Sequence, residues 1–115
     1  MNPETILQNK IIDALNRNGC HAWNHTVGMF YTKYGSRLNI GNHGEADIWG
    51  FRHSDGKMFF IEVKLPGEKP REDQYQFLSA MQESGALSGW CTSVEGAIKI
   101  MEGTKGNVQL SAETW

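Results

Sequence analysis

The chain has 115 residues, a length that fits one domain, residues 1–115, with a single hydrophobic core. Hydrophobic residues make up 39% of it and charged residues 21%, which excludes a disordered chain and indicates a globular one. The net charge of −2 gives no overall sign of a nucleic-acid partner, so such evidence must come from local clusters.

The sequence also indicates where the protein works. No apolar run approaches the roughly 20 residues that cross a bilayer, and the start, MNPETILQNK, lacks the order of a signal peptide. Cys20 and Cys91 lie far apart and form no CxxC unit, which favours free thiols. We therefore expect an intracellular, cytoplasmic protein without a membrane segment.

The first predicted element is a helix that ends near Gly19. Asn2 is a suitable N-cap, and Pro3 occupies the first helical position. One face of the helix is apolar, with Leu7, Ile11, Ala14 and Leu15. Glu4 falls on this inward face, which is an unusual place for a carboxylate.

Strands are predicted in the middle of the chain. Residues 27–40 contain aromatic and β-branched residues interrupted by glycine and serine at 35–36, which predicts two short strands and a turn. A further strand is expected over 47–51. Residues 55–56 are Asp-Gly, a hairpin turn signal, so a strand over 59–64 should pair antiparallel with 47–51.

A second helix is predicted over 71–84, with Gln74 on its apolar face. A short strand is expected over 89–93 and a last helix over 94–101, whereas the tail 107–115 fits no single element. The order helix, strands, helix, strand, helix predicts an α/β or α+β domain with helices around a mixed central sheet.

Two charged residues interrupt the apolar strand FFIEVK, residues 59–64. Alternate residues of a strand share a face, so Glu62 and Lys64 point to the same side, and Asp47 on the partner strand lies beside Glu62. Two adjacent carboxylates repel each other unless a cation lies between them, and Mg²⁺ takes such oxygen ligands while retaining waters. This arrangement predicts metal-assisted hydrolysis of a phosphodiester, in which Lys64 orients the water or stabilises developing charge.

Three short motifs at this point resemble a known family. They are GEAD at 44–47, IEVK at 61–64 and the helix DQYQFLSAM at 73–81. Together they resemble the PD-(D/E)XK nuclease superfamily, and within it the VRR-NUC, or virus-type replication-repair nuclease, domain. The resemblance covers nearly the whole chain and implies a restriction-endonuclease-like fold. Ala46 departs from the family pattern, which usually has a proline there.

The resemblance also implies residue roles. Asp47, Glu62 and the Val63 carbonyl would bind the metal, Lys64 would be the catalytic lysine, Gln74 would organise the catalytic site, and Glu4 would be an auxiliary carboxylate. Ordinary structural explanations exist for each side chain: a surface ion pair for Glu62 and Lys64, a loop cap for Asp47, a helix-dipole contact for Glu4, and a buried amide for Gln74.

The implied activity is that of a Mg²⁺- or Mn²⁺-dependent DNA endonuclease. The resemblance suggests structured or branched DNA as substrate, a homodimer, and a phage-type role in replication and repair, with no organic cofactor. Four cations are candidates for phosphate contacts, or else are ordinary surface charges: Lys33, Arg37, Lys69 and Arg71. Two alternatives remain: a catalytically weak nucleic-acid-binding subunit with the same fold, and a metal-dependent RNase.

Overall fold

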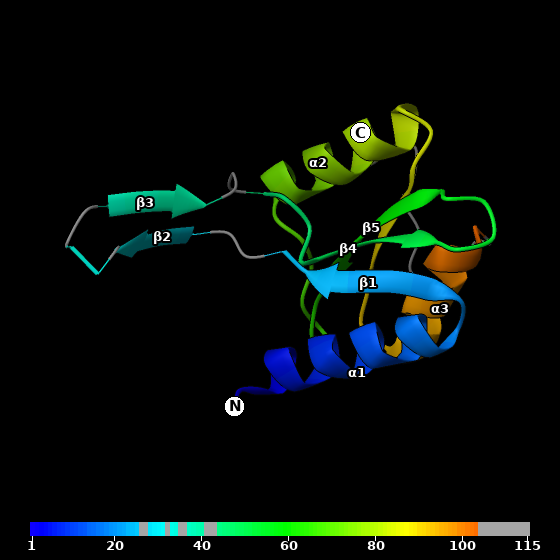
Figure 1. Ribbon diagram of the computed structural model, residues 1–115, viewed down its shortest axis with the longest axis horizontal. Coiled ribbons are helices and arrows are strands. Elements are labelled where there is room, and N and C mark those ends of the chain that lie inside the picture. Colours follow the sequence, from blue (N-terminus) through cyan, green and yellow to red (C-terminus); the bar gives the residue numbers. More distant parts are fainter. Residues whose placement is uncertain (26–27, 32, 35–36, 41–43, 104–115) are drawn as a thin grey trace.

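A four-stranded mixed sheet forms the centre of the molecule, in the order β1-β4-β5-β6. These strands are β1 (Cys20–Asn24), β4 (Ile48–Arg52), β5 (Met58–Val63) and β6 (Leu87–Cys91). β1, β4 and β5 run antiparallel, whereas β6 is parallel to β5. Helices α1 (Pro3–Arg17) and α3 (Val94–Glu102) cover one face, and α2 (Glu72–Glu83) covers the other (Figure 1). The expected α+β architecture is therefore confirmed.

This computed structural model describes residues 1–25, 28–31, 33–34, 37–40 and 44–103, with the backbone alone for 28–31 and 37–40. Strands β2 (Gly28–Tyr31) and β3 (Arg37–Ile40) pair antiparallel in a separate two-stranded sheet (Figure 1), which confirms the two short strands predicted there. The predicted turn at 35–36 and the tail 107–115 lie outside the described residues.

The helices begin and end where local chemistry stabilises their free backbone groups. At α1 the Asn2 side chain accepts a hydrogen bond of 2.8 Å from the Thr5 N–H, as an N-cap does. Ser93 caps α3 in the same way by accepting from the Gly96 N–H at 3.1 Å, and Gly103 ends this helix with a φ of +81°. In the described part of the chain, no helix has both the length and the apolar character that a membrane span needs.

Strand β5 is covered on both faces. Phe59, Ile61 and Val63 are fully buried in the core that α1 and α3 share. Phe60 points to the opposite face and packs with Leu78 of α2. Alternation places Glu62 on this second face, beneath α2. The predicted antiparallel pairing of β4 with β5 is confirmed, with Ile48 opposite Ile61.

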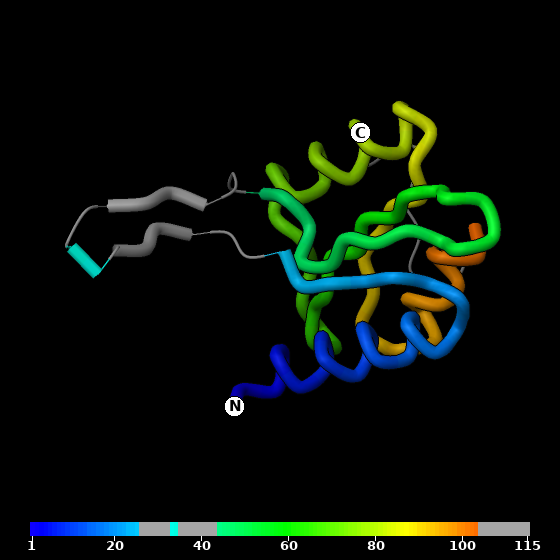
Figure 2. The backbone as a smooth tube through the Cα atoms, viewed as in Figure 1, coloured from blue at the N-terminus to red at the C-terminus, as the bar shows by residue number. Residues whose placement is uncertain are grey.

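Strand β1 is missing from the sequence-based prediction. The backbone passes from α1 directly into this strand (Figure 2), which pairs with β4 along its whole length. Cys20 and Ala22 are buried, whereas His21 and Trp23 are exposed. The alternation is present, but the two buried side chains are small, so pairing with β4 and not local propensity makes this segment a strand.

Candidate active site

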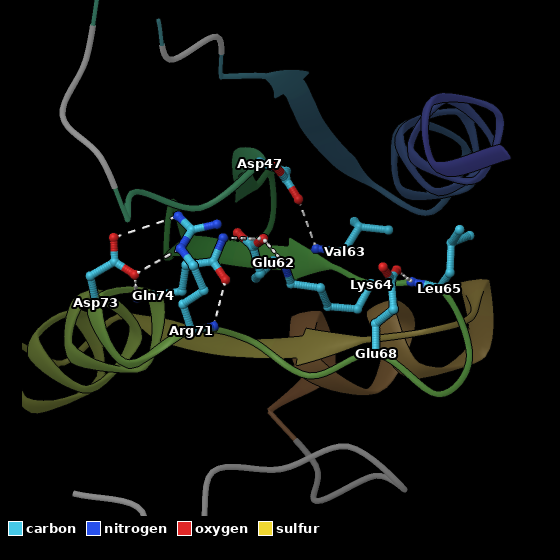
Figure 3. Close-up of polar contacts among 9 residues, drawn as sticks. All are labelled: Asp47, Glu62, Val63, Lys64, Leu65, Glu68, Arg71, Asp73 and Gln74. Carbon is cyan, nitrogen blue, oxygen red and sulfur yellow. Dashed lines mark hydrogen bonds and ion pairs between the residues drawn. The ribbon is translucent and has the colours of Figure 1, made fainter. Parts of the chain in front are cut away.

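Glu62 is the central residue of the candidate site. Its side chain is 2% exposed, because β5 lies between helices on both faces. Its Oε2 accepts a hydrogen bond of 2.9 Å from the Gln74 amide, and the Lys64 Nζ lies 3.5 Å from the same oxygen (Figure 3). Its Oε1 is buried and has no hydrogen-bond partner among the residues that the structure describes. One half of a buried carboxylate is thus held by the protein and the other half is not.

Asp47 reaches the same place from the neighbouring strand. It lies directly before β4, and the antiparallel register with β5 sets it beside Glu62 and Val63. Its Oδ2 accepts a hydrogen bond of 3.0 Å from the Val63 N–H (Figure 3). The predicted meeting of Asp47, Glu62 and Lys64 is therefore present in the structure.

Nearby donors and cations only partly offset the burial of the two carboxyl groups. Burial, followed by the nearby Asp47 carboxylate, raises the pKa of Glu62 to about 8, although Lys64 opposes this rise. Burial also raises the pKa of Asp47, against the opposing effect of the Val63 N–H. Burial without full pairing disfavours the charged form of a carboxylic acid. The nearby Lys64 and Arg71 side chains therefore offset only part of the cost of burying two carboxyl groups side by side.

A divalent cation between the two carboxyl groups would offset the cost of burying them. A hard cation such as Mg²⁺ or Mn²⁺ takes carboxylate oxygens and needs few protein ligands, because it keeps several waters. The buried Glu62 Oε1 is an unused acceptor of the kind such an ion requires. Bound between Asp47 and Glu62, the cation would offset both the burial and the mutual repulsion of the two carboxylates.

Gln74 connects the site to α2. It lies in the first turn of this helix, where its Oε1 accepts a hydrogen bond of 2.8 Å from the Arg71 N–H. Its Nε2 donates to Glu62 at 2.9 Å. The same side chain thus fixes the start of α2 and the orientation of the Glu62 carboxylate. Its predicted inward position is confirmed, and a role in catalysis stays a prediction.

Glu4 lies in the electrostatic surroundings of the site. Partial burial and then Asp47 raise the pKa of Glu4, whereas Lys64 lowers it. Among the described residues, however, no three His, Cys, Asp or Glu side chains form a group that could hold a metal. Glu4, Asp47 and Glu62 thus do not form such a group, and the auxiliary role of Glu4 stays a prediction. The Val63 carbonyl stays a predicted ligand.

The four candidate phosphate-binding cations are distributed unevenly. Arg71 is exposed next to the site, where its Nε lies 3.2 Å from Asp73 Oδ1 and its charge lowers the pKa of Asp47. Lys69 is exposed in the loop before α2. Lys33 is exposed after β2, with its Nζ 5.1 Å from the centre of the Tyr34 ring. The Arg37 side chain lies outside what the structure describes.

Sequence patterns alone do not reveal the contacts around Asp47. The His25 N–H donates a hydrogen bond of 2.7 Å to the Asp47 carbonyl, and its Nε2 donates to Glu45 Oε1 at 2.9 Å. Trp49 donates through its indole N–H to the Ala46 carbonyl at 3.1 Å. Glu45 and Ala46 belong to the GEAD motif, which marks the segment in the sequence, but its partners depend on the pairing of β1 with β4.

Comparison with solved structures identifies the fold. The chain is similar to a structure titled "VRR_NUC domain", with a TM-score of 0.64 and 18% sequence identity over 89% of this chain and 97% of that chain. A scan of family models and a search of curated proteins give no match. The chain therefore has the VRR-NUC fold, as its motifs led us to expect.

Proposed function

We propose that this chain is a divalent-metal-dependent endonuclease that hydrolyses phosphodiester bonds in DNA. The observation that carries the proposal is the buried Glu62 Oε1, which no donor among the described residues reaches, while the Asp47 carboxyl group beside Glu62 could only share a proton with it. If Glu62 served only in the ion pair with Lys64, burying this oxygen without a partner would cost stability and bring no benefit. If the oxygen is a ligand of the cation, it gains a partner, and the VRR-NUC fold supports a nuclease.

In this proposal Mg²⁺ or Mn²⁺ is held by Asp47, Glu62 and the Val63 carbonyl. Such a cation makes water more acidic and offsets charge on the phosphodiester. Lys64, whose Nζ is 3.5 Å from Glu62, stabilises charge that develops on the phosphoryl group. Gln74 keeps the Glu62 carboxylate in place by its 2.9 Å hydrogen bond.

The cations around the site bind the DNA backbone. Arg71 and Lys69, both exposed beside the start of α2, contact phosphates next to the scissile bond. Lys33 and Arg37 belong to the β2–β3 segment and contact phosphates farther along the DNA. Substitution of any of these cations should weaken DNA binding and leave the cleavage rate at saturation nearly unchanged.

The proposed substrate and assembly rest on the likeness to the VRR-NUC domain. We propose branched or junction DNA as substrate and a homodimer as the active form, because a two-fold dimer presents two sites to one DNA molecule. The proposed role is in phage-type replication and repair inside the host cell. The cytoplasm suits its two free, buried cysteines.

A cleavage panel tests the proposal. Linear, flapped and four-way DNA and matched RNA are incubated with Mg²⁺, Mn²⁺ or chelator, and the oligomeric state is measured by analytical ultracentrifugation. Glu62→Gln serves as the inactive variant. Glu72→Gln, the same change at an exposed position in α2, is the matched control. We expect cleavage of branched DNA that needs the metal, is lost in Glu62→Gln and persists in Glu72→Gln.

Other outcomes point to the alternatives. DNA binding without metal-dependent cleavage would indicate a catalytically weak binding subunit, and cleavage of RNA alone would indicate an RNase. Equal cleavage by Glu62→Gln and the wild type would exclude the site described above. Cleavage of junctions by a protein that sediments as a monomer would exclude the dimer as the active form.

A further inference from the structure

The segment that presents Asp47 has no regular secondary structure of its own. Residues 45–46 precede β4 and belong to no strand or helix. Ala46 also lacks the ring by which a proline would restrict the backbone there. A carboxylate that meets a cation must nevertheless be held close to its productive position. The contacts that hold this segment therefore matter to the site.

Trp49 provides the first of these contacts. Its indole Nε1–H donates a hydrogen bond of 3.1 Å to the Ala46 carbonyl. The ring is itself fixed by the core beneath α2, because it meets Phe60 edge-on at 5.0 Å and stacks near Phe77 at 6.2 Å between ring centres. The hydrogen bond thus ties the backbone just before Asp47 to well-packed side chains of β5 and α2.

His25, directly after β1, provides the second set of contacts. Its N–H donates to the Asp47 carbonyl at 2.7 Å. Its imidazole stacks on the Trp49 ring, with the ring centres 4.1 Å apart and the planes at 22°. Its Nε2 lies 2.9 Å from Glu45 Oε1, and both of these side chains are at most 20% exposed. Three consecutive residues, 45–47, are therefore each held by His25 or Trp49.

We propose that Trp49 and His25 are positioning residues, which form a clamp on residues 45–47 and set the Asp47 carboxylate beside Glu62 before the cation binds. This inference rests on the proposed function, because it assigns the clamp to cation binding. Neither side chain is offered as a ligand. The indole has no acceptor, and the imidazole Nε2 is engaged with Glu45. Loss of the clamp adds a cost of ordering the segment at the moment the cation binds, which lowers affinity.

The test measures cation affinity without DNA. Trp49→Phe keeps an aromatic ring in the core and removes the indole N–H together with part of the ring. Trp23→Phe is the matched control, because Trp23 lies directly opposite Trp49 on β1 and contacts His21 and Phe51 instead of the clamped segment. Free Mn²⁺ is quantified by electron paramagnetic resonance. We expect a roughly 5- to 10-fold rise in the Mn²⁺ Kd for Trp49→Phe, the effect of about one hydrogen bond, and no rise for Trp23→Phe.

His25→Phe is a second variant, which keeps the stack on Trp49 and removes the contact with Glu45. Its effect and that of Trp49→Phe should not add, because both act on the same three residues. For both variants the Mn²⁺ concentration at half-maximal cleavage should rise, while the cleavage rate at saturating Mn²⁺ stays within about threefold of wild type. A catalytic role would instead lower the saturated rate.

Two results would overturn the clamp while leaving the proposed function in place: wild-type Mn²⁺ affinity in both Trp49→Phe and His25→Phe, or an equal loss in Trp23→Phe, which would indicate general loosening. The absence of Mn²⁺ binding to the wild type would overturn both proposals. Thermal unfolding of each variant is measured in chelator, so that a destabilised fold is separated from a misplaced Asp47.

Discussion

At the scale of single residues, Glu62 stands out because its two oxygens have different surroundings. Oε2 has Gln74 and Lys64 as partners, whereas Oε1 is buried and has no partner in the described part of the chain. Because its pKa is raised to about 8, Glu62 retains a proton in the folded protein at pH values where the unfolded chain has lost it. A residue that weakens the metal-free fold is difficult to explain by stability, and the proposed cation binding would explain it.

The first prediction follows from this difference in proton binding. Between the ordinary value of 4.5 and about 8, the folded state binds more protons at Glu62 than the unfolded state, so stability falls as pH rises through this window. Glu62→Gln removes the charge, and we expect it to raise the free energy of unfolding at pH 8 by about 1 to 3 kcal/mol, at about 1.4 kcal/mol per pKa unit. Urea unfolding in chelator at pH 5 and pH 8 measures this. A destabilised variant at pH 8 would contradict it.

The second prediction concerns Lys64, whose side chain is 14% exposed beside Glu62. Lys64→Ala should lower the single-turnover cleavage rate by roughly 10²- to 10³-fold, because charge that develops in the transition state loses a stabiliser. DNA affinity, titrated in Ca²⁺, should change little. Lys69→Ala is the control, since an exposed phosphate contact should affect affinity and spare the rate. If Lys64→Ala weakened binding alone, Lys64 would be a binding residue.

At the scale of elements, the loop before Asp47 is packed against the start of α2. Gly44 is buried, has a φ of +89°, and lies so close to α2 that an added Cβ would be 2.9 Å from the Asp73 carbonyl oxygen. The first turn of the same helix carries Gln74, which bonds to Glu62. The loop and the helix therefore bring their site residues together through one close backbone contact.

The third prediction separates this contact from backbone strain. Gly44→Ala places a side chain at an unfavourable φ and creates a clash, whereas Gly67→Ala meets a similar φ, +91°, with no atom of the described residues within 4 Å of the new Cβ. We expect a loss of roughly 1 kcal/mol for Gly67→Ala and roughly 2 to 4 kcal/mol for Gly44→Ala. Urea midpoints at unchanged m-value measure both losses. Equal losses would show that the contact with Asp73 contributes nothing.

The elements that carry the site were more predictable than those that support it. Glu62 and Lys64 could be found because charges in an apolar strand stand out, and strand alternation then fixes which side they share. Gln74 could be found because it interrupts the apolar face of a helix. Strand β1 could not be found from the sequence, since its buried residues, Cys20 and Ala22, are small. The contacts of His25 with residues 45–47 then depend on a strand pairing that local patterns do not contain.

At the scale of the whole molecule, the site joins distant parts of the chain. Asp47 lies before β4, and Glu62 lies in β5. Gln74 belongs to α2, which covers the face of the sheet opposite to α1 and α3. The carboxylates meet only when β4 and β5 are paired, so the unfolded chain has no such site. A cation bound between Asp47 and Glu62 should therefore stabilise the whole domain and not a single loop.

The fourth prediction tests this coupling by thermal unfolding. At pH 8 and a Mn²⁺ concentration about 100-fold above its Kd, binding adds about 2.7 kcal/mol to the stability of the folded state, which corresponds to a Tm rise of roughly 10 °C for a domain of this size. The rise should shrink at pH 5.5, where protons compete for the carboxylates whose pKa values are raised. Chelator should reverse it. Glu62→Gln should show almost no rise, since it lacks the carboxylate that the cation needs. An equal rise in Tm in that variant would show that the stabilising cation binds elsewhere and that the buried Glu62 Oε1 is not one of its ligands.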